Sequence, residues 1–530
     1  MPAPKVLISD ALSETAVAIF RDRGIDVTFD PDLGKDKDRL AAMIGAFDGL
    51  AVRSATKVTE KVLAAATRLK VVGRAGIGVD NVDLKAATAK GVIVMNTPYG
   101  NSITTAEHAI AMLMALARQI PEANASTHAG KWEKARFMGV EVFNKTLGVI
   151  GCGNIGAIVA DRAQGLKMRV IAYDPFLSPE RAQVLGVEKV ELADLLARAD
   201  FITLHTPMTP QTRNILSADN IARTRKGVRI VNCARGGLVD EAALAQALRA
   251  GHVAGAALDV FEVEPAKENV LFGLPNVIAT PHLGAATDEA QENVALQVAE
   301  QMSDYLIKGA ITNAINFPSI SAEEAPRLTP WVRLAGEVGS FAGQLTDVAI
   351  KAIRIEYLGE VAALNIKPLT AAAVAGVLRH SMPGLNMVAA GAIAKERGIL
   401  IEEMNSSGGG GAYESLVKLT VKTDTYERSL AGTVFSDGRP RIVQVRDIDM
   451  DFALAPHMMF VRNQDKPGFI GQFGMVMGSA GVNIATFNLG RVAPGGDAIA
   501  IVALDAPVSD EVLSKVAALP QVVRARRLAF

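Results

Sequence analysis

Residues 146–156 have the sequence TLGVIGCGNIG, in which a short apolar strand pattern runs directly into a glycine-rich turn. Gly151, Gly153 and Gly156 give the spacing GxGxxG, and the small residues that follow, with Asn154 and Ile155 between the glycines, favour a helix. Glycines at these positions permit a tight turn and let the backbone approach a pyrophosphate at the helix N-terminus. The stretch therefore predicts a strand–turn–helix unit that binds a dinucleotide.

The next strand pattern decides which dinucleotide is favoured. It ends at Asp174, 18 residues after Gly156, where a carboxylate accepts hydrogen bonds from ribose hydroxyls and repels a 2′-phosphate. NAD is therefore favoured over NADP, with a purely structural glycine-rich turn as the alternative. Cys152 is expected to fill space in the turn, not to act as a nucleophile.

Two series of strand and helix patterns flank this motif. Their alternation predicts an α/β fold with two flavodoxin/Rossmann-like parallel-sheet domains in tandem. A long helix from Thr104 to Arg118 lies between the series, with Asn101, Ser102, Thr104 and Thr105 as candidate caps. The expected strands are 5–9, 27–29, 49–53, 70–74 and 92–96 in the first series, and 146–151, 168–174, 201–205, 228–234, 254–260 and 277–282 in the second.

The pattern changes after a helix expected over 287–308. Residues 315–330, rich in Pro, Ser and Glu, are interpreted as a linker. Antiparallel strand patterns follow in an α+β intervening region, where GGGG at 408–411 suggests a turn or flexible joint. The last part, from about Pro456, has the strand–helix–strand–strand–helix–strand order of a ferredoxin-like domain.

Composition limits the class of protein. The 530 residues predict three to four domains at about 150 residues each. With 55 Lys+Arg against 56 Asp+Glu, the chain shows no basic footprint for nucleic acid or an anionic membrane. Two cysteines, no secretory signal pattern and no apolar run of about 18 residues indicate a soluble, cytoplasmic protein.

Ionisable residues follow three later strand patterns: Arg235 in NCARGG, Glu262 and Glu264 in DVFEVEP, and His282 in TPHLGAAT. Ligands of open α/β sheets bind beyond the carboxyl ends of the strands, so these side chains point toward one crevice. A histidine can take the hydroxyl proton during hydride transfer, a carboxylate can fix its tautomer, and an arginine can bind a carboxylate. Taken singly, each has a bland alternative, such as a structural histidine or a surface arginine.

Together these motifs resemble the D-isomer-specific 2-hydroxyacid dehydrogenase family over roughly residues 1–316. The resemblance implies that His282 is the acid/base, Glu264 its partner and Arg235 the ligand of the substrate carboxylate, which leaves Glu262 as a bystander. It implies NAD contacts for the glycine-rich turn and Asp174, and also for Thr206, Cys233, Asp259 and His282. No metal site is predicted.

The same resemblance implies a division into domains and a substrate side of the cleft. A substrate-binding domain is expected over 1–99 and 285–316, and an NAD-binding Rossmann domain over 100–284. The loop 74–83 with Gly76, and also Asn101, would face the substrate. Arg53, Arg74 and Arg136 could bind a phosphate, with ordinary strand-end solvation as the alternative for the first two.

The additional C-terminal residues resemble the long-form enzymes of this family that oxidise 3-phosphoglycerate. The resemblance implies an intervening domain over 317–453, of the allosteric substrate-binding type, and an ACT regulatory domain over 454–530. DKPG and GVNI in the last domain match ACT positions, so Asn463, Asp465 and Asn483 are expected to bind an effector, L-serine. The alternative is a domain that only assembles the chain into a homo-oligomer, expected to be a tetramer.

The function implied is NAD-dependent oxidation of 3-phospho-D-glycerate to 3-phosphohydroxypyruvate, the first step of L-serine biosynthesis. Two alternatives stay open from the sequence. One is a related dehydrogenase or reductase acting on hydroxypyruvate, glyoxylate or 2-hydroxyglutarate. The other is a non-catalytic NAD-sensing protein, against which the Arg–Glu–His set argues.

Overall fold

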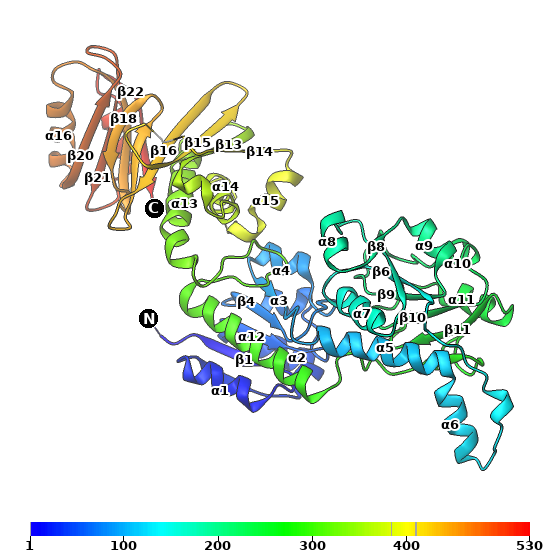
Figure 1. The fold of residues 1–530 in the computed structure, drawn as a ribbon. Coiled ribbons are helices and arrows are strands. Elements are labelled where there is room, and N and C mark those ends of the chain that lie inside the picture. The colour runs from blue at the N-terminus through cyan, green and yellow to red at the C-terminus, as the bar shows by residue number, and fades with distance from the viewer. Residues whose placement is uncertain (1, 383, 409–410) are drawn as a thin grey trace.

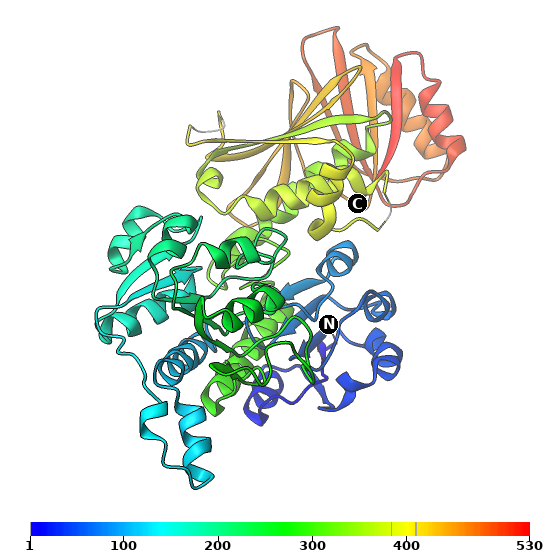
Figure 2. The same cartoon turned by 90° about the vertical axis from the view of Figure 1, so that its right-hand side faces the viewer.

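The structure is a computed structural model that describes residues 2–382, 384–408 and 411–530. Four sheets follow one another along the chain, and Figures 1 and 2 show the last two gathered at one end of the molecule, away from the first two. Helix α12 (Asp288–Lys308) leads from the second sheet back to the first, as Figure 1 shows. The predicted fold class, with parallel sheets first and mixed sheets later, is confirmed.

The first sheet is parallel with the order β2-β1-β3-β4-β5. Strands β1, β3, β4 and β5 bury nearly every side chain because helices cover both faces, whereas the edge strand β2 buries none of its residues fully. A Cβ on Gly73 would lie 2.2 Å from Met302 Sδ, so α12 packs directly on β4. The elements are β1 (Lys5–Ile8), α1 (Glu14–Asp22), β2 (Asp26–Phe29), α2 (Lys37–Met43), β3 (Gly49–Val52), α3 (Glu60–Ala65), β4 (Val71–Arg74), α4 (Leu84–Lys90), β5 (Ile93–Met95) and α12 (Asp288–Lys308).

The second sheet is also parallel, with the order β12-β11-β10-β9-β6-β7-β8. Strand β6 pairs with β7 on one side and with β9 on the other, so the strand order reverses there and opens a crevice beyond its carboxyl end. The strands are β6 (Thr146–Ile150), β7 (Arg169–Tyr173), β8 (Glu188–Lys189), β9 (Phe201–Leu204), β10 (Val228–Asn232), β11 (Val253–Leu258) and β12 (Val277–Ala279). The helices are α5 (Ser102–Arg118), α7 (Asn154–Gly165), α8 (Pro179–Val184), α9 (Leu192–Arg198), α10 (Ala218–Ala222) and α11 (Glu241–Arg249).

The third sheet has six strands in the order β14-β13-β15-β16-β17-β18. The antiparallel pairings expected from the sequence are confirmed from β13 through β15 to β18, whereas β14 pairs with β13 in parallel and was not predicted. The elements are α13 (Ala325–Gln344), β13 (Ile350–Gly359), α14 (Lys367–Arg379), α15 (Met387–Glu396), β14 (Leu400–Ser406), β15 (Ser415–Thr423), β16 (Glu427–Val434), β17 (Pro440–Val445) and β18 (Ile448–Phe452). Of the predicted GGGG joint at 408–411, residues 409 and 410 lie outside the described residues.

The linker predicted over 315–330 is too long, because α13 already begins at Ala325. Pro326 stands in the first turn, where its missing N–H costs nothing, and Pro330 is accommodated inside the helix. Leu328 and Leu334 are buried by this helix, which supplies the packing that outweighs the proline.

The fourth sheet has the order β20-β21-β19-β22, all antiparallel, with α16 and α17 in the crossovers. This is the ferredoxin-like order that the sequence predicted. The elements are β19 (His457–Gln464), α16 (Phe469–Ser479), β20 (Ile484–Arg491), β21 (Asp497–Leu504), α17 (Asp510–Ala517) and β22 (Val522–Ala529).

One arm leaves the main body. Helix α6 (Ile120–His128) and the residues after it extend from the second sheet's domain away from the other elements, as both views show (Figures 1 and 2). Trp132 and Met138 on this arm are 86% and 76% exposed. Across the described ranges, no helix is long and apolar enough to cross a membrane.

Candidate active site

The glycine-rich turn joins β6 to the start of α7 and leaves a cradle beside the backbone. Gly151 has φ +89°, and a Cβ on Gly156 would lie 2.1 Å from the Gly151 carbonyl oxygen, so the turn closes only on glycine. At Gly153, which caps the helix, a Cβ would meet nothing within 4 Å. This open space at a helix N-terminus, with Asn154 and Ile155 in the first turn, fits a pyrophosphate.

Asp174 lies beside this cradle, directly after β7. Its Oδ2 accepts a hydrogen bond from the Cys152 N–H at 2.8 Å, and its Oδ1 accepts one from the Phe176 N–H at 2.8 Å. The carboxylate is thereby fixed at the edge where the ribose of a dinucleotide would lie. Burial raises the pKa of the Cys152 thiol to about 11, so this cysteine stays protonated as a packing residue.

Thr206 and Cys233 also border the crevice. A Cβ on Gly151 would lie 3.0 Å from the Thr206 backbone nitrogen, which places Thr206 against the glycine-rich turn. Cys233 follows β10 and is buried, and burial raises the pKa of its thiol well above the ordinary range. Both residues therefore lie where NAD contacts were predicted, and those contacts remain predictions.

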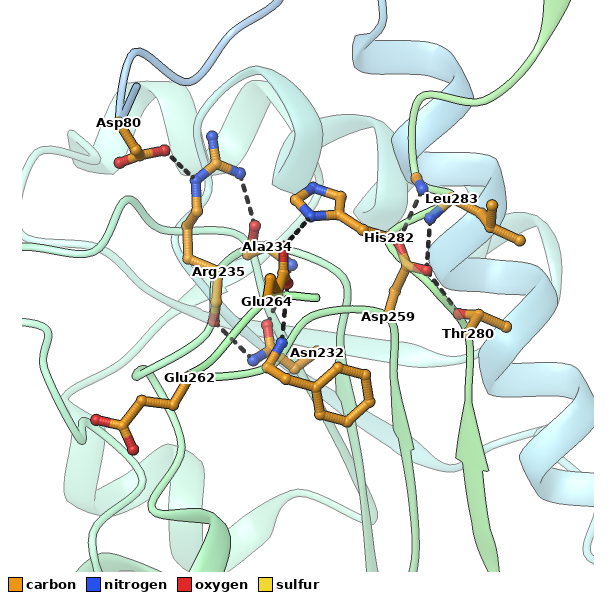
Figure 3. A network of polar contacts seen from close by, with 12 residues as sticks. Asp80, Asn232, Ala234, Arg235, Asp259, Glu262, Glu264, Thr280, His282 and Leu283 are labelled. Carbon is orange, nitrogen blue, oxygen red and sulfur yellow. Dashed lines mark hydrogen bonds and ion pairs between the residues drawn. The ribbon is translucent and has the colours of Figure 1, made fainter. Parts of the chain in front are cut away.

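Glu264 and His282 form the central pair. His282 Nδ1 lies 2.7 Å from Glu264 Oε2, while the other carboxylate oxygen accepts the Phe261 N–H at 3.0 Å (Figure 3). Burial works to raise the pKa of Glu264, but the hydrogen bonds from His282 and Phe261 outweigh it and hold that pKa below its ordinary value. A carboxylate on Nδ1 leaves Nε2 of the half-exposed imidazole free to exchange a proton with a substrate.

A second carboxylate shapes the loop that carries His282. Asp259 is fully buried; its Oδ1 accepts the Thr280 hydroxyl at 2.6 Å and the Leu283 N–H at 2.7 Å, and its Oδ2 accepts the Gly284 N–H at 2.7 Å. His282 has φ +59°, an unfavourable backbone conformation that this network holds in place. Asp259 was predicted to contact NAD, a role that stays a prediction beside this structural one.

His108 on α5 lies beside the Asp259 network as an ion-pair partner, and its role was not predicted. Its Nε2 lies 3.3 Å from Asp259 Oδ1. Burial works to raise the pKa of Asp259, but His108, Thr280 and the Leu283 N–H hold it below its ordinary value. No strand-end pattern marks His108, because it comes from the middle of a helix.

Arg235 reaches across the cleft between the first two sheets. Its Nε donates to Asp80 Oδ2 at 2.9 Å, and its Nη1 donates to the Ala234 carbonyl oxygen at 2.7 Å (Figure 3). Asn232 holds the same turn, since its Nδ2 donates to the Arg235 carbonyl oxygen at 2.9 Å. Asp80 belongs to the loop 74–83 expected to face the substrate, but sequence reasoning did not single it out.

Arg53 follows β3 and Arg74 is the last residue of β4, and both Arg53 and Arg235 lie close enough to Arg74 to act on its charge. Burial and the nearby Arg235 and Arg53 guanidinium groups lower the pKa of Arg74 to about 10, and Asp80 opposes this only in part. Arg74 Nε is buried without a hydrogen-bond partner. Gly76, with φ +135°, makes room for this guanidinium, because a Cβ there would lie 1.5 Å from Arg74 Nη1. A buried guanidinium with an unpaired N–H, such as that of Arg74, is the donor that a phosphate or carboxylate needs.

The structure does not bring every predicted residue to the cleft. Arg136 follows α6 in a short 3-10 turn (Lys134–Arg136), where it pairs with Glu133 at 3.0 Å, so the structure of one chain does not place it with Arg53 and Arg74, and its phosphate contact stays a prediction. Its place follows from α6, which carries the segment away from the sheets. Glu262 pairs with Arg213 at 3.4 Å and points away from His282 (Figure 3).

Asn101 starts α5 and is buried at 9% exposure, with its side-chain oxygen unpaired in hydrogen bonding. Asn101 occupies the N-cap position, but its side chain makes no capping hydrogen bond. Ser102, another candidate cap, instead donates its hydroxyl hydrogen to the Pro98 carbonyl oxygen at 2.8 Å.

The predicted effector residues lie in the fourth sheet's domain and are held separately. Asn463 is buried, and its side-chain oxygen has no partner. Asp465 Oδ2 accepts Arg491 Nη1 at 2.6 Å and the Gly495 N–H at 3.0 Å, whereas Asn483 Nδ2 donates to Asp505 Oδ2 at 2.7 Å. The described contacts of one chain do not join the three side chains into a single site.

Comparison with known proteins identifies the family. Residues 110–284 match the "D-isomer specific 2-hydroxyacid dehydrogenase, NAD binding domain" family and residues 327–446 the "D-3-phosphoglycerate dehydrogenase intervening domain" family. The D-3-phosphoglycerate dehydrogenase of Bacillus subtilis is 41% identical over 520 residues, 98% of each chain, and that of Synechocystis is 42% identical over 514 residues, 97% of this chain and 92% of that one. The solved D-lactate dehydrogenase of Aquifex aeolicus, complexed with NAD and lactic acid, is 27% identical at a TM-score of 0.52, covering 59% of this chain and all of that one. The chain therefore belongs to the D-3-phosphoglycerate dehydrogenase family of D-isomer specific 2-hydroxyacid dehydrogenases, with an NAD-binding domain at its centre.

Proposed function

We propose that this protein oxidises the C2 hydroxyl of 3-phospho-D-glycerate to give 3-phosphohydroxypyruvate, the first step of L-serine biosynthesis. The observation that carries the substrate assignment is the arginine cluster at the cleft. Arg53 and Arg235 are both close enough to Arg74 to lower its pKa, Asp80 pairs with Arg235 alone, and the buried Nε of Arg74 is unpartnered among the described residues. A substrate with a carboxylate at one end and a phosphate at the other would supply the missing negative charge. Glyoxylate and hydroxypyruvate lack the phosphate, so the cluster favours 3-phosphoglycerate over them.

The chain's own residues would divide the work as follows. Arg235 binds the substrate carboxylate after exchanging it for Asp80, and Arg53 and Arg74 bind the phosphate. His282 Nε2 takes the proton of the C2 hydroxyl, and the Glu264 carboxylate on Nδ1 stabilises the imidazolium that forms. NAD, when bound, accepts the hydride from C2. Gly151, Gly153, Asp174 and the residues beside them would hold that cofactor.

The test follows absorbance of NADH formed from 3-phosphoglycerate, with glycerate and 2-hydroxyglutarate as comparison substrates. The wild type should be fastest with 3-phosphoglycerate, and His282→Ala should abolish turnover while the dissociation constant for NAD changes little. NADH formation from the unphosphorylated acids alone would contradict the substrate assignment, and a His282→Ala variant with wild-type kcat would contradict the mechanism.

We further propose the predicted four-domain division, with substrate binding over 1–99 and 285–316 and NAD binding over 100–284. The intervening domain would span 317–453 and an ACT domain 454–530, since each observed sheet falls within one of these ranges. The exposed Trp132 and Met138 of the projecting arm support assembly into a homo-oligomer, with a tetramer as the expected form. The buried, unpaired thiols of Cys152 and Cys233 support a reducing, cytoplasmic location.

Inhibition by L-serine through Asn463, Asp465 and Asn483 is the effector proposal. The unpaired side-chain oxygen of buried Asn463 supports it, because such an atom is costly unless a ligand or a second chain satisfies it. Adding L-serine to the NADH assay tests it: inhibition that Asn463→Ala removes is expected, and no inhibition of the wild type would refute it.

A further inference from the structure

The segment that carries Arg53 is held by a buried carboxylate from another strand. Asp10 follows β1 and is 2% exposed. Its Oδ2 accepts the Arg53 N–H at 2.6 Å and the Thr56 N–H at 3.2 Å, and its Oδ1 accepts the Thr56 hydroxyl at 2.6 Å. These three hydrogen bonds fix both ends of the turn 53–56.

Asn81 braces the same turn from the opposite side. Its Nδ2 donates to the Arg53 carbonyl oxygen at 2.6 Å and to the Thr56 carbonyl oxygen at 2.7 Å. Asn81 lies in the loop 74–83, which begins at Arg74. One amide therefore ties the backbone of the Arg53 turn to the loop that begins at Arg74, and so fixes the point from which the Arg53 side chain extends.

The backbone at Gly34 packs directly against Asp10 and Thr56. A Cβ on Gly34 would lie 2.0 Å from Thr56 Oγ1 and 2.5 Å from Asp10 Oδ1, so only glycine fits against the pair. Thr56 itself is fully buried, and its Oγ1 lies 2.8 Å from Ser9 Oγ. Asp10 thus stabilises the turn 53–56. Within the part of the chain that the structure describes, the Arg53 guanidinium donates one hydrogen bond, to the Ala11 carbonyl oxygen at 3.1 Å, which leaves its other N–H groups for a ligand.

We propose that Asp10 and Asn81 are positioning residues that hold Arg53 for a phosphorylated substrate, and that they contribute to selectivity without touching it. The proposal rests on the proposed function, because it assumes that Arg53 meets the substrate phosphate. A guanidinium binds an anion well only when its N–H groups are aligned, and a displacement of about 1 Å can cost up to about 100-fold in rate.

The experiment compares Asp10→Asn, Asn81→Ala and Arg53→Ala in the full chain, measuring kcat, KM for 3-phosphoglycerate and the dissociation constant of NADH. Asp10→Asn and Asn81→Ala should each raise KM about tenfold or more, with kcat within about twofold and NADH binding unchanged. Asp10→Asn removes both hydrogen-bonding capacity and a negative charge, whereas Asn81→Ala removes hydrogen bonds alone. A rise in KM in Asn81→Ala is therefore due to the position of Arg53 and not to a changed charge. In the Arg53→Ala background, both substitutions should have no further effect on KM.

Asp48→Asn is the matched control. Asp48 is also buried in this domain, at 4% exposure, but it lies at the amino end of β3, whereas Arg53 lies beyond the carboxyl end. There it pairs with Arg68 and Lys70. It should lower stability without raising KM. The proposal is overturned if KM for 3-phosphoglycerate is unchanged in both Asp10→Asn and Asn81→Ala. It is also overturned if either substitution still raises KM in the Arg53→Ala background.

Failure of the proposed function has a separate signature. If the wild type forms no NADH from 3-phosphoglycerate, the function is refuted, and calorimetric titration with inorganic phosphate then tests the arginine site alone. Weaker phosphate binding by Asp10→Asn than by Asp48→Asn supports the positioning role, and equal binding overturns it.

Discussion

The two oxygens of Glu264 have different partners, and this division explains how one carboxylate can orient a histidine. Oε1 is occupied by the Phe261 N–H of its own turn, and Oε2 is left for His282 Nδ1. The backbone bond fixes the carboxylate, so the imidazole is aimed by a rigid partner and not by a mobile side chain.

Replacing Glu264 with Gln should lower kcat about tenfold or more, because a neutral amide stabilises the imidazolium less well than a carboxylate. The acidic limb of the pH profile of kcat/KM, which reports protonation of the base, should move to lower pH. Glu262→Gln is the control, since that carboxylate lies two residues earlier and pairs with Arg213. Identical acidic limbs in Glu264→Gln and wild type would contradict the pairing.

At the scale of the element, β9 is followed by a half-buried histidine, His205, that the mechanism does not use. His205 Nε2 lies 2.8 Å from Thr203 Oγ1, and its Nδ1 is buried without a partner. Burial lowers the pKa of His205 from 6.5 to about 3, so the folded protein keeps the ring neutral.

The unfolded chain protonates His205 below about pH 6.5, so the folded state loses stability as the pH falls from there toward 3. The slope from this group should be about 0.7 kcal/mol per pH unit at pH 6.5 and approach about 1.4 kcal/mol per pH unit by pH 5. His205→Gln should flatten that slope in urea melts followed by circular dichroism, whereas exposed His128→Gln should not. Parallel stability curves for His205→Gln and wild type would show that the ring titrates alike in both states.

Elements set by local pattern were predictable, and elements set by distant packing were not. The β-branched run TLGVI (146–150) and the glycines after it predicted β6 to within one residue and a helix directly after the turn, where α7 begins, because the local geometry demands them. Strand β14 was missed because its parallel pairing with β13 depends on α14 and α15 between them.

The same distinction applies to the site. Arg235, Glu264 and His282 follow strand patterns and were identifiable from the sequence. Asp80 and His108 carry no such signal, because they meet Arg235 and Asp259 only when separate parts of the chain fold together. Asp10 was detectable in principle, since it also follows a strand of the parallel sheet.

At the scale of the whole molecule, one close contact joins the substrate-side sheet to the intervening region. Gly91, between α4 and β5, has φ +77°, and a Cβ there would lie 2.5 Å from the Asn386 side-chain carbon. Asn386 caps α15, and its Nδ2 also lies 3.4 Å from the Ala89 carbonyl oxygen. An apolar cavity of about 240 Å³, lined in part by Tyr305 and Phe317, lies beside this contact. This contact lies at the amino end of β5, whereas Arg53 and Arg74 lie at the carboxyl ends of β3 and β4.

Gly91→Ala should therefore loosen the two parts without impairing catalysis. The added methyl group both strains the backbone and collides with Asn386, so small-angle scattering should show a larger radius of gyration and proteolysis should cut faster within 315–324. Gly251→Ala is the matched control, because Gly251 has φ +69° but a Cβ there would meet nothing within 4 Å. Asn386→Ser in the Gly91→Ala chain keeps a helix cap and removes the collision, and should restore the compact form. If Gly91→Ala and Gly251→Ala behave alike, backbone strain alone explains the effect and the contact does not hold the two parts together.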